Sequence, residues 1–436
     1  MLDAQGSPLN WYDAGVRHLW LRPEGAEPLA VALTHGSRIV LDDERELLDG
    51  TGGGWTACHG FTHPHIGMAV ARQLERMPHA PLDGMIHQQP AKLAGRLAKL
   101  LPGDLDHVVF SESGSDAMEN AIRIALRYCE TRGGGLRRKF LGFRGGWHGG
   151  TAAAVALSDP ALVRDAPHRN FVARQYFARL PSDPKSMAAF ESLLARHGEK
   201  LAAIVVEPLV QAAGGMKFHD AEVLRGVRAS ADRHGILLIF DESFTGFGRT
   251  GAMFASEAAG VLPDIVTLSK ALTGGTLPLA ATVMRKNVFE ALSANGAAPH
   301  STFAGNAMAC AAANASLDLF EQEPRLEQAA EIARQFTEGL APCRGFAGVR
   351  AVRVKGAVGV VELRRLDDPG ALQQRFVDAG VWLRPVGKAV ALTPALSIEP
   401  YDLTQLIGTT VKVLHEATRR RRTGRTASPD QVDLPL

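Results

Sequence analysis

Residues 264–275 read DIVTLSKALTGG, a short apolar run that ends at Lys270 and is followed by a turn with two glycines. The run is typical of a buried strand, and the glycines indicate that the chain turns directly after it. A lysine near the end of a sheet strand is usually exposed. In a partly desolvated cleft, however, its pKa falls, and the amine can then form an imine with an aldehyde.

The same alternation of short apolar runs and longer amphipathic stretches continues along the chain. Residues 105–129 predict a strand, a turn and a helix, because Ala121, Ile124 and Tyr128 recur at helical spacing after the turn. Further strands are predicted at 200–210 and 236–242, with a helix between them that closes at Gly235. Strands that alternate with helices predict an α/β fold with a mostly parallel sheet covered by helices.

Two regions depart from the alternation and set the expected domain organisation. Residues 1–50 contain a hairpin pattern at 36–50 and are predicted to be an N-terminal segment of a small domain. Residues 51–325 form the expected large domain, and 326–418 a C-terminal small α+β domain. The last stretch, 419–436, begins with four arginines and is rich in turn formers, so we expect a flexible tail, although the arginines could also grip a phosphate.

Composition narrows the classes of partner. The 436 residues include 48 Lys and Arg against 46 Asp and Glu, a net charge of +2 with no evident basic face, so no nucleic-acid partner is expected. No apolar run approaches the ~18 residues that span a bilayer, and the first residues lack a signal-peptide pattern. We therefore expect no membrane partner and a cytoplasmic location. The four cysteines form no C-x-x-C pair, which favours buried thiols over a disulfide framework or a metal site.

Ligands of parallel sheets bind beyond the carboxyl ends of the strands, and two further strand ends carry unusual residues. The run Ser111 to Ser115, with Gly114 within it, opens a helix whose free N–H groups could hold a phosphate, although such residues also cap ordinary helices. Asp241 lies at the end of the strand predicted at 236–242. It could be a general base, a metal ligand or the partner of a protonated ring nitrogen, or simply an ion pair or helix cap.

One cofactor, pyridoxal 5′-phosphate, would use all three features: the possible phosphate site at 111–115, the carboxylate of Asp241 and the amine of Lys270. That cofactor has an aldehyde that bonds lysine, a ring nitrogen that a carboxylate keeps protonated, and a phosphate that needs an anion site. No metal is expected.

At this point the residues resemble a known family. Four stretches are similar to class III pyridoxal-phosphate aminotransferases of fold type I: IVVEPLVQAAGGM (204–216), LLIFDESFTGFGRTG (237–251), TLSKALTGGTLPLAA (267–281) and STFAGNAMACAAANASL (301–317). The resemblance runs from about His18 to Thr410. The stretches HLW, TACHGFTHP, VRVKGAVGVVE and GVWLRPVGK are more typical of one branch, the adenosylmethionine-8-amino-7-oxononanoate aminotransferases of biotin synthesis. The resemblance implies a large domain and a small domain built from both ends of the chain.

The resemblance also implies roles for the cofactor-binding residues. Lys270 would hold the cofactor covalently, and Asp241 would pair with the pyridine nitrogen. Gly114 and Ser115 would bind the phosphate. Trp147, in GGWHGG, stands where the family has an aromatic residue that stacks on the ring. Without the family, Trp147 could equally be a core-packing residue.

The remaining implied roles concern substrate and assembly. Thr302 matches a residue that reaches the phosphate of the neighbouring subunit, which implies a homodimer with shared active sites. Arg384 matches the arginine that holds the carboxylate of the oxo-acid acceptor, Arg249 lies near the amino donor, and Trp55 belongs to the substrate contacts. Without the family, Thr302 could be an ordinary turn residue, and each of the two arginines could form a surface ion pair.

The expected activity is transfer of an amino group from a small-molecule donor to a carboxylate-bearing oxo acid, similar to 7,8-diaminononanoate synthesis. The chain departs from the biotin branch where that branch contacts substrate. It lacks a tyrosine after HLW, it has Gly54 before Trp55 where the branch has two tryptophans, and it has Trp147 and Gly150 where the branch has tyrosine and aspartate. A divergent aminotransferase with another donor or acceptor, an aminomutase and a non-catalytic binding protein are the alternatives. Retention of Lys270 argues against the last of these.

Overall fold

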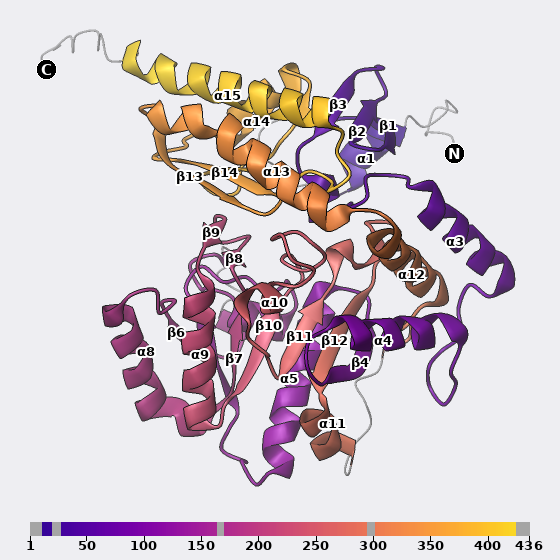
Figure 1. Ribbon diagram of the computed structural model, residues 1–436, viewed down its shortest axis with the longest axis vertical. Coiled ribbons are helices and arrows are strands. Elements are labelled where there is room, and N and C mark those ends of the chain that lie inside the picture. Colours follow the sequence, from indigo (N-terminus) through magenta and orange to yellow (C-terminus); the bar gives the residue numbers. More distant parts are fainter. Residues whose placement is uncertain (1–10, 20–27, 164–169, 294–300, 424–436) are drawn as a thin grey trace, which may run out of the picture.

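The fold is described from a computed structural model that covers residues 11–19, 28–163, 170–293 and 301–423 (Figure 1), with the side chains of 293 and 419–423 excepted. A seven-stranded sheet forms the centre of the larger part of the molecule, with the strand order β4-β12-β11-β10-β7-β5-β6. The strand β12 runs antiparallel to both of its neighbours, and the other strands are parallel. The predicted α/β fold with a mostly parallel sheet is confirmed. The strands are β4 (Leu105–Ser111), β5 (Lys139–Phe143), β6 (Tyr176–Ala178), β7 (Leu201–Val206), β10 (Leu237–Asp241), β11 (Ile265–Leu268) and β12 (Ala280–Arg285).

Helices cover both faces of this sheet, and the alternation of side chains along β7 shows how. Every residue of β7 is buried. Ile204 and Val206 pack in one core cluster with α4 (Gln88–Leu100), α8 (Pro184–His197) and α9 (Ala221–His234). Ala203 and Val205 pack on the other face with α5 (Gly114–Thr131), α6 (Ala152–Leu157) and α11 (Lys286–Ser293). Successive residues of a strand point to opposite faces, so a strand buried on both sides is apolar throughout.

Local signals fix where the helices begin and end. Ser113 is the N-cap of α5, and its hydroxyl accepts a hydrogen bond from the backbone N–H of Asp116 at 3.2 Å. Gly235 closes α9 in the left-handed conformation with φ of 58°, which only glycine adopts without strain. The sequence predicted this helix end correctly.

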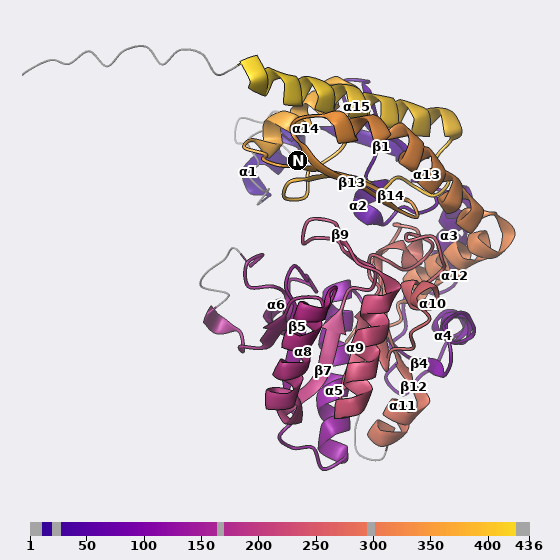
Figure 2. The same ribbon diagram turned by 60° about the vertical axis from the view of Figure 1, so that its left-hand side comes forward.

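A smaller part of the molecule lies above the large sheet in Figures 1 and 2. One of its sheets has the order β1-β2-β3-β15 and the other β13-β14-β16. Leu48 of β3 pairs in parallel with Val381 of β15, so the two ends of the chain share one sheet. The elements of this small part are β1 (Val31–His35), β2 (Arg38–Leu41), β3 (Glu46–Asp49), β13 (Val349–Lys355), β14 (Val358–Leu363), β15 (Val381–Trp382), β16 (Ala389–Leu392), α13 (Arg325–Gly339), α14 (Pro369–Asp378) and α15 (Pro400–Thr423).

The hairpin predicted at 36–50 is confirmed as the antiparallel pair of β2 and β3. The domain boundaries at residues 50, 325 and 418 stay predictions. The helix α15 continues to Thr423, past the expected start of the tail, and residues 424–436 lie outside the described part. The remaining elements are α1 (Trp11–His18), α2 (Gly52–Trp55), α3 (Pro64–Arg76), α10 (Ala255–Ala259), α12 (Ala307–Gln322), β8 (Val210–Gln211), β9 (Lys217–Phe218) and the 3-10 turns η1 (Gly198–Lys200), η2 (Lys270–Thr273) and η3 (Ala341–Gly345).

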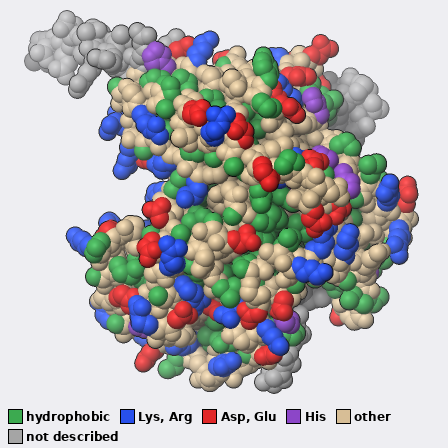
Figure 3. All heavy atoms as spheres, viewed as in Figure 1, with side chains coloured by type: hydrophobic (Ala, Val, Ile, Leu, Met, Phe, Trp, Pro, Cys, Tyr) green, Lys and Arg blue, Asp and Glu red, His purple; other side chains and the backbone are tan. Residues whose placement is uncertain are grey.

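Two findings bear on the expected classes of partner. Among the described helices, none is long and apolar enough to cross a membrane. On the face shown in Figure 3, basic and acidic side chains are interspersed rather than separated into single-sign regions. The four cysteines are buried free thiols, as the sequence predicted.

Candidate active site

The carboxyl ends of five parallel strands of the large sheet carry the polar residues of one site. Figure 1 shows this edge of the sheet turned toward the small part, with β8 and β9 between them. Parallel strands end at the same edge, so residues that are far apart in the sequence come together there. Gly114 follows β4, Trp147 and His148 follow β5, Glu207 follows β7, Asp241 ends β10, and Lys270 follows β11.

Asp241 is buried, and both oxygens of its carboxylate accept hydrogen bonds. Its Oδ2 accepts a hydrogen bond from Nδ1 of His148 at 2.9 Å. Its Oδ1 accepts bonds from the backbone N–H of Ser243 at 3.1 Å and from the hydroxyl of Thr267 at 3.2 Å. Thr267 is in position because it pairs with Asp241 across β10 and β11. The carboxylate is thus held in one orientation at the end of its strand.

The hydrogen bond between Asp241 and His148 favours the ionised form of each side chain. Burial alone raises the pKa of Asp241, but the hydrogen bond and charge of His148 and the charge of Lys270 outweigh it, so this pKa lies below its ordinary value. Burial lowers the pKa of His148, yet its hydrogen bond to Asp241 and that carboxylate's charge raise it above the ordinary value. Asp241 is therefore a carboxylate at neutral pH and can keep a nearby ring nitrogen protonated.

Lys270 occupies a strained position at the start of η2. Its φ is 51°, in the left-handed region that costs a non-glycine residue about 1 kcal/mol. Burial lowers the pKa of Lys270, and the charges of Asp241 and Glu207 partly oppose that effect. Its Nζ lies 5.8 Å from the ring centroid of Trp55, which packs edge-on against Phe244 with centroids 5.0 Å apart. A desolvated amine of this kind is a competent nucleophile toward an aldehyde.

The first turn of α5 forms a recess suited to an anion. A Cβ on Gly114 would lie 2.9 Å from the hydroxyl of Ser269 and 3.2 Å from that of Ser243, so only glycine fits between them. The hydroxyl of Ser115 accepts a hydrogen bond from the N–H of Gly150 at 3.0 Å. The first N–H groups of a helix have no partner within the helix, and its dipole favours negative charge there. This arrangement can bind a phosphate.

The loop that carries Trp147 is anchored by Glu207. The backbone N–H groups of Trp147 and Ala212 each donate to its carboxylate at 2.9 Å. Burial raises the pKa of Glu207 to about 7. Trp147 itself is half-buried at this edge of the sheet, beside His148 of the ion pair.

The turn that holds Thr302 lies beside the recess of α5. The hydroxyl of Ser301 and the backbone N–H of Phe303 both donate to Glu112, which precedes α5. The Thr302 side chain is exposed, as is 53% of Phe303. The turn of Thr302 is thus held by the residue two positions before α5 of its own chain, and the Thr302 side chain is open at the surface.

The two predicted substrate arginines differ in setting. Arg249 is buried, and its Nη1 donates to the carbonyls of Pro394 at 2.8 Å and Ala357 at 3.2 Å. Burial lowers the pKa of Arg249 to about 10. Within the described residues its buried Nη2 has no partner, and a Cβ on Gly52 would lie 3.4 Å from it. This nitrogen thus faces the turn that carries Trp55, whereas Arg384 is exposed in the segment that follows β15.

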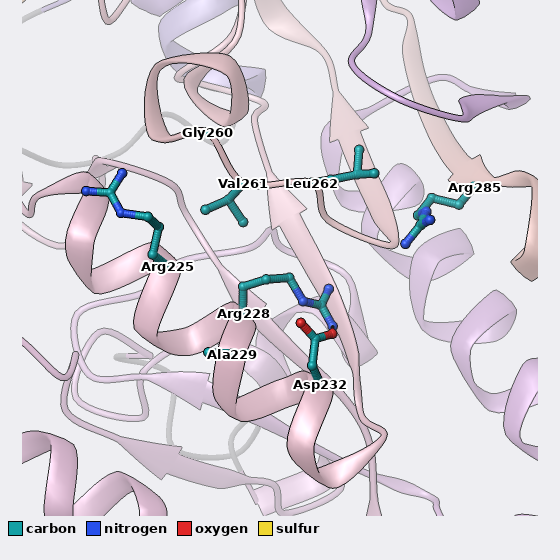
Figure 4. Close-up of a pocket in the computed structure, with 8 residues that line it drawn as sticks. All are labelled: Arg225, Arg228, Ala229, Asp232, Gly260, Val261, Leu262 and Arg285. Atoms are coloured by element: carbon teal, nitrogen blue, oxygen red, sulfur yellow. Dashed lines mark ion pairs between the residues drawn. The ribbon is translucent and has the colours of Figure 1, made fainter.

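A separate hollow of about 340 Å³, shown in Figure 4, lies at the opposite edge of the sheet. It is lined by residues of α9, by 260–262 before β11 and by Arg285 at the end of β12. Its arginines are paired with acidic side chains, for example Arg228 with Asp264 at 2.8 Å and Arg285 with Asp104 at 2.7 Å. The hollow takes no part in the site described above.

Comparison with known proteins identifies the family. Residues 22–414 match the family model described as aminotransferase class III. The chain belongs to the class III aminotransferases.

Curated relatives of this aminotransferase cover most of its length. It is 40% identical over 395 residues to the adenosylmethionine-8-amino-7-oxononanoate aminotransferase of Mycobacterium leprae, with 88% of this chain and 91% of that protein aligned. It is 36% identical over 389 residues to the protein of the same name from Corynebacterium glutamicum, with 87% and 92% aligned.

Solved structures agree with the fold. An amine transaminase from an uncultivated Pseudomonas species, in its PLP-bound form, is 31% identical with a TM-score of 0.85, over 92% of this chain and 98% of that one. The adenosylmethionine-8-amino-7-oxononanoate aminotransferase of Methanocaldococcus jannaschii is 26% identical with a TM-score of 0.87, over 93% and 98%. The resemblance to fold type I transaminases is confirmed.

The aminotransferase uses pyridoxal 5′-phosphate. The residues at the strand ends fit this cofactor, because the recess at Gly114 suits its phosphate, the ionised Asp241 suits its ring nitrogen, and the desolvated Lys270 suits its aldehyde.

Sequence reasoning assigned no role to His148 or Glu207. Each follows a strand of the large sheet, but Glu207 falls inside the strand predicted at 200–210 and no strand was predicted before His148. The rule applied to Asp241 and Lys270 finds both residues only once the ends of β5 and β7 are known.

Proposed function

We propose that Lys270 is the residue that bonds the cofactor and moves the proton in this aminotransferase, with Asp241 as the partner of the pyridine nitrogen. The position of the desolvated Lys270 amine beside the ionised Asp241 at one sheet edge carries this proposal. Gly114 and Ser115 bind the phosphate, and Trp147 stacks on the ring.

When bound, pyridoxal 5′-phosphate supplies an electrophilic aldehyde and an electron-withdrawing protonated ring. The chain's own residues do the rest. Nζ of Lys270, whose pKa burial lowers, would hold the aldehyde covalently and would give it up to the donor amine. The same amine would be the general base that takes the proton from the donor carbon and the general acid that delivers it to the cofactor carbon. Asp241, held by His148 and Thr267, keeps its charge throughout.

The proposed reaction moves an amino group from a small-molecule donor to a carboxylate-bearing oxo acid. The relatives named as adenosylmethionine-8-amino-7-oxononanoate aminotransferases support the biotin-pathway pair of substrates. Arg384 is proposed to hold the carboxylate of the acceptor. Arg249 is proposed to face the donor through its unpartnered Nη2.

A second candidate is a divergent aminotransferase of a specialised pathway with another donor or acceptor. The positions that depart from the biotin branch favour it, because a Cβ at Gly54 or at Gly150 would meet no atom within 4 Å. Space that larger side chains would take is thus open beside Trp55 and beside the phosphate recess. Loss of hydrogen-bonding side chains weakens discrimination against other substrates.

The test is a substrate panel on the purified enzyme. The pair of S-adenosylmethionine and 8-amino-7-oxononanoate is compared with other amines and oxo acids by kcat/KM. Formation of 7,8-diaminononanoate at a rate that no other pair exceeds supports the biotin reaction. A higher kcat/KM for another pair supports the divergent function.

We also propose a homodimer in which Thr302 serves the phosphate of the neighbouring subunit. Exposed apolar side chains around its turn and on nearby helices support this proposal, because such side chains mark protein interfaces. They are Phe303, Met85, Ile86, Met68 and Leu74, which are between 51% and 81% exposed. Sedimentation of the cofactor-loaded enzyme is expected to give a dimer, and an active monomer would contradict it. A cytoplasmic location stays a prediction.

A further inference from the structure

A chain of buried polar groups leads from the small part of the molecule to the turn of Lys270. The Nε of Arg325 donates to Nδ1 of His59 at 3.0 Å. Nε2 of His59 lies 3.0 Å from the hydroxyl of Ser316, and that hydroxyl lies 3.4 Å from the carbonyl oxygen of Ala271. His59 and Arg325 are each 3% exposed, and Ser316 is fully buried. Ala271 directly follows Lys270 in η2.

The direction of each hydrogen bond in this chain is fixed. A guanidinium can only donate, so Nδ1 of His59 accepts and carries no proton. The proton of the neutral imidazole is then on Nε2, which donates to Ser316. The hydroxyl of Ser316 is left to donate to the carbonyl of Ala271. Burial and the charge of Arg325 lower the pKa of His59 to about 3, so this single tautomer persists over the working pH range.

The carbonyl of Ala271 is the point where the chain meets the catalytic turn. It also accepts the backbone N–H of Gly274 at 2.9 Å, the bond that closes η2. Gly274 has φ of 62°, and a Cβ there would lie 2.6 Å from Ile66 and 3.3 Å from the His59 ring. His59 therefore packs on one end of η2 and reaches the carbonyl at the other through Ser316. A strained φ such as that of Lys270 persists only where surrounding contacts determine it.

We propose that His59, acting through Ser316, is a positioning residue that holds the η2 turn so that Lys270 keeps its left-handed conformation and its amine stays aimed into the site. The proposal rests on the role proposed for Lys270 above. Arg325 begins α13, so the same contacts tie the lysine to the small part of the molecule. Neither His59 nor Ser316 touches substrate in this scheme.

The test compares Ser316→Ala with Ser230→Ala in the full-length holoenzyme. Both serines are fully buried in helices and hydrogen-bonded, but Ser230 lies near the C-terminal end of α9, at the opposite edge of the sheet. Both changes are expected to lower stability. Only Ser316→Ala is expected to lower kcat, by about fivefold, with KM little changed. This is the effect of losing one net hydrogen bond that stabilises the transition state but not the bound substrate. Equal kcat in the two variants would overturn the proposal.

Two further measurements separate positioning from activity. Hydrogen exchange of the peptide that covers 268–279 is expected to accelerate in Ser316→Ala and His59→Phe but not in Ser230→Ala, because the amide of Gly274 is protected by the closed turn. Unchanged exchange overturns the proposal even if the parent enzyme shows no transamination. His59→Gln, which restores a donor and an acceptor, is expected to recover most of the kcat that His59→Phe loses. A glutamine variant as slow as the phenylalanine variant contradicts a hydrogen-bonding role.

Discussion

Replacing His148 by phenylalanine is expected to shift the acid limb of the pH profile upward. The change keeps an aromatic ring but removes the Nδ1 that donates to Asp241 at 2.9 Å. A hydrogen bond to a charged group contributes about 1.5–3 kcal/mol. Its loss, together with that of the charge on His148, therefore raises the pKa of Asp241.

The acid limb is expected to move to higher pH because the native pKa of Asp241 lies below its ordinary value. In the parent, the carboxylate persists as the pH falls, until the low pKa of Asp241 is reached. In His148→Phe the carboxylate is protonated at a higher pH, so activity is lost earlier on acidification. The stability that the lowered pKa of Asp241 gives the parent above the unfolded pKa is smaller in the variant at neutral pH.

The assay measures kcat/KM of the half-reaction with an amino donor, from the change in cofactor absorbance, between about pH 3 and pH 9, a range that extends below the ordinary pKa of an aspartate. His148→Asn is the matched control, because its amide nitrogen can take the place of Nδ1 as a neutral donor, and a smaller shift is expected. The charge of His148 also lowers the pKa of Glu207, which is about 7 in the parent, so any limb near that pH is expected to move upward as well and is read separately from the limb of Asp241 at lower pH. If the acid limb of His148→Phe coincides with that of the parent, the reasoning is refuted and other groups keep Asp241 ionised.

Three other outcomes are expected. Lys270→Ala should lose at least about a thousandfold in turnover while the fold and some cofactor affinity remain, because only the covalent and proton-moving roles are removed, and Lys270→Arg, which keeps the charge, should be equally slow in steady-state assays. Asp241→Asn should bind the cofactor but slow the half-reaction about a hundredfold, which stopped-flow absorbance measures; an unchanged rate would count against the assignment. Gly356→Ala should destabilise the protein by about 2–4 kcal/mol, because its Cβ would lie 2.3 Å from the carbonyl carbon of Thr250 at a φ of 52°. Gly387→Ala, at a φ of 61° with open space around it, is the control for strain alone, and thermal melting that moves equally in both would disprove the clash.

Much of the large sheet could be predicted from sequence because its strands are short apolar runs separated by helices. The reversed direction of β12 was not predicted. Its signal was present, since only a short segment separates Leu268 from Ala280, and a parallel crossover needs a dozen or more residues. Spacing between runs therefore carries directional information that hydrophobic periodicity lacks.

The site was predictable where the residue type at a strand end indicates the chemistry by itself, as it does for Lys270 and Asp241. The setting of Arg249 was not, because its partners Ala357 and Pro394 are carbonyls that any residue could supply. The ionisation of Asp241 likewise depends on His148, which lies far away in the sequence and comes close only through the order of the strands.

The pairing of Leu48 with Val381 has a consequence for biosynthesis. All strands of the large sheet leave the ribosome before β15 does, so that sheet can assemble while the C-terminal segment is still being made. The strand β3 cannot pair with β15 until nearly the whole chain is synthesised. Contacts of such long sequence separation also form slowly. During that interval β3 presents an open edge, at which it can pair wrongly with other strands.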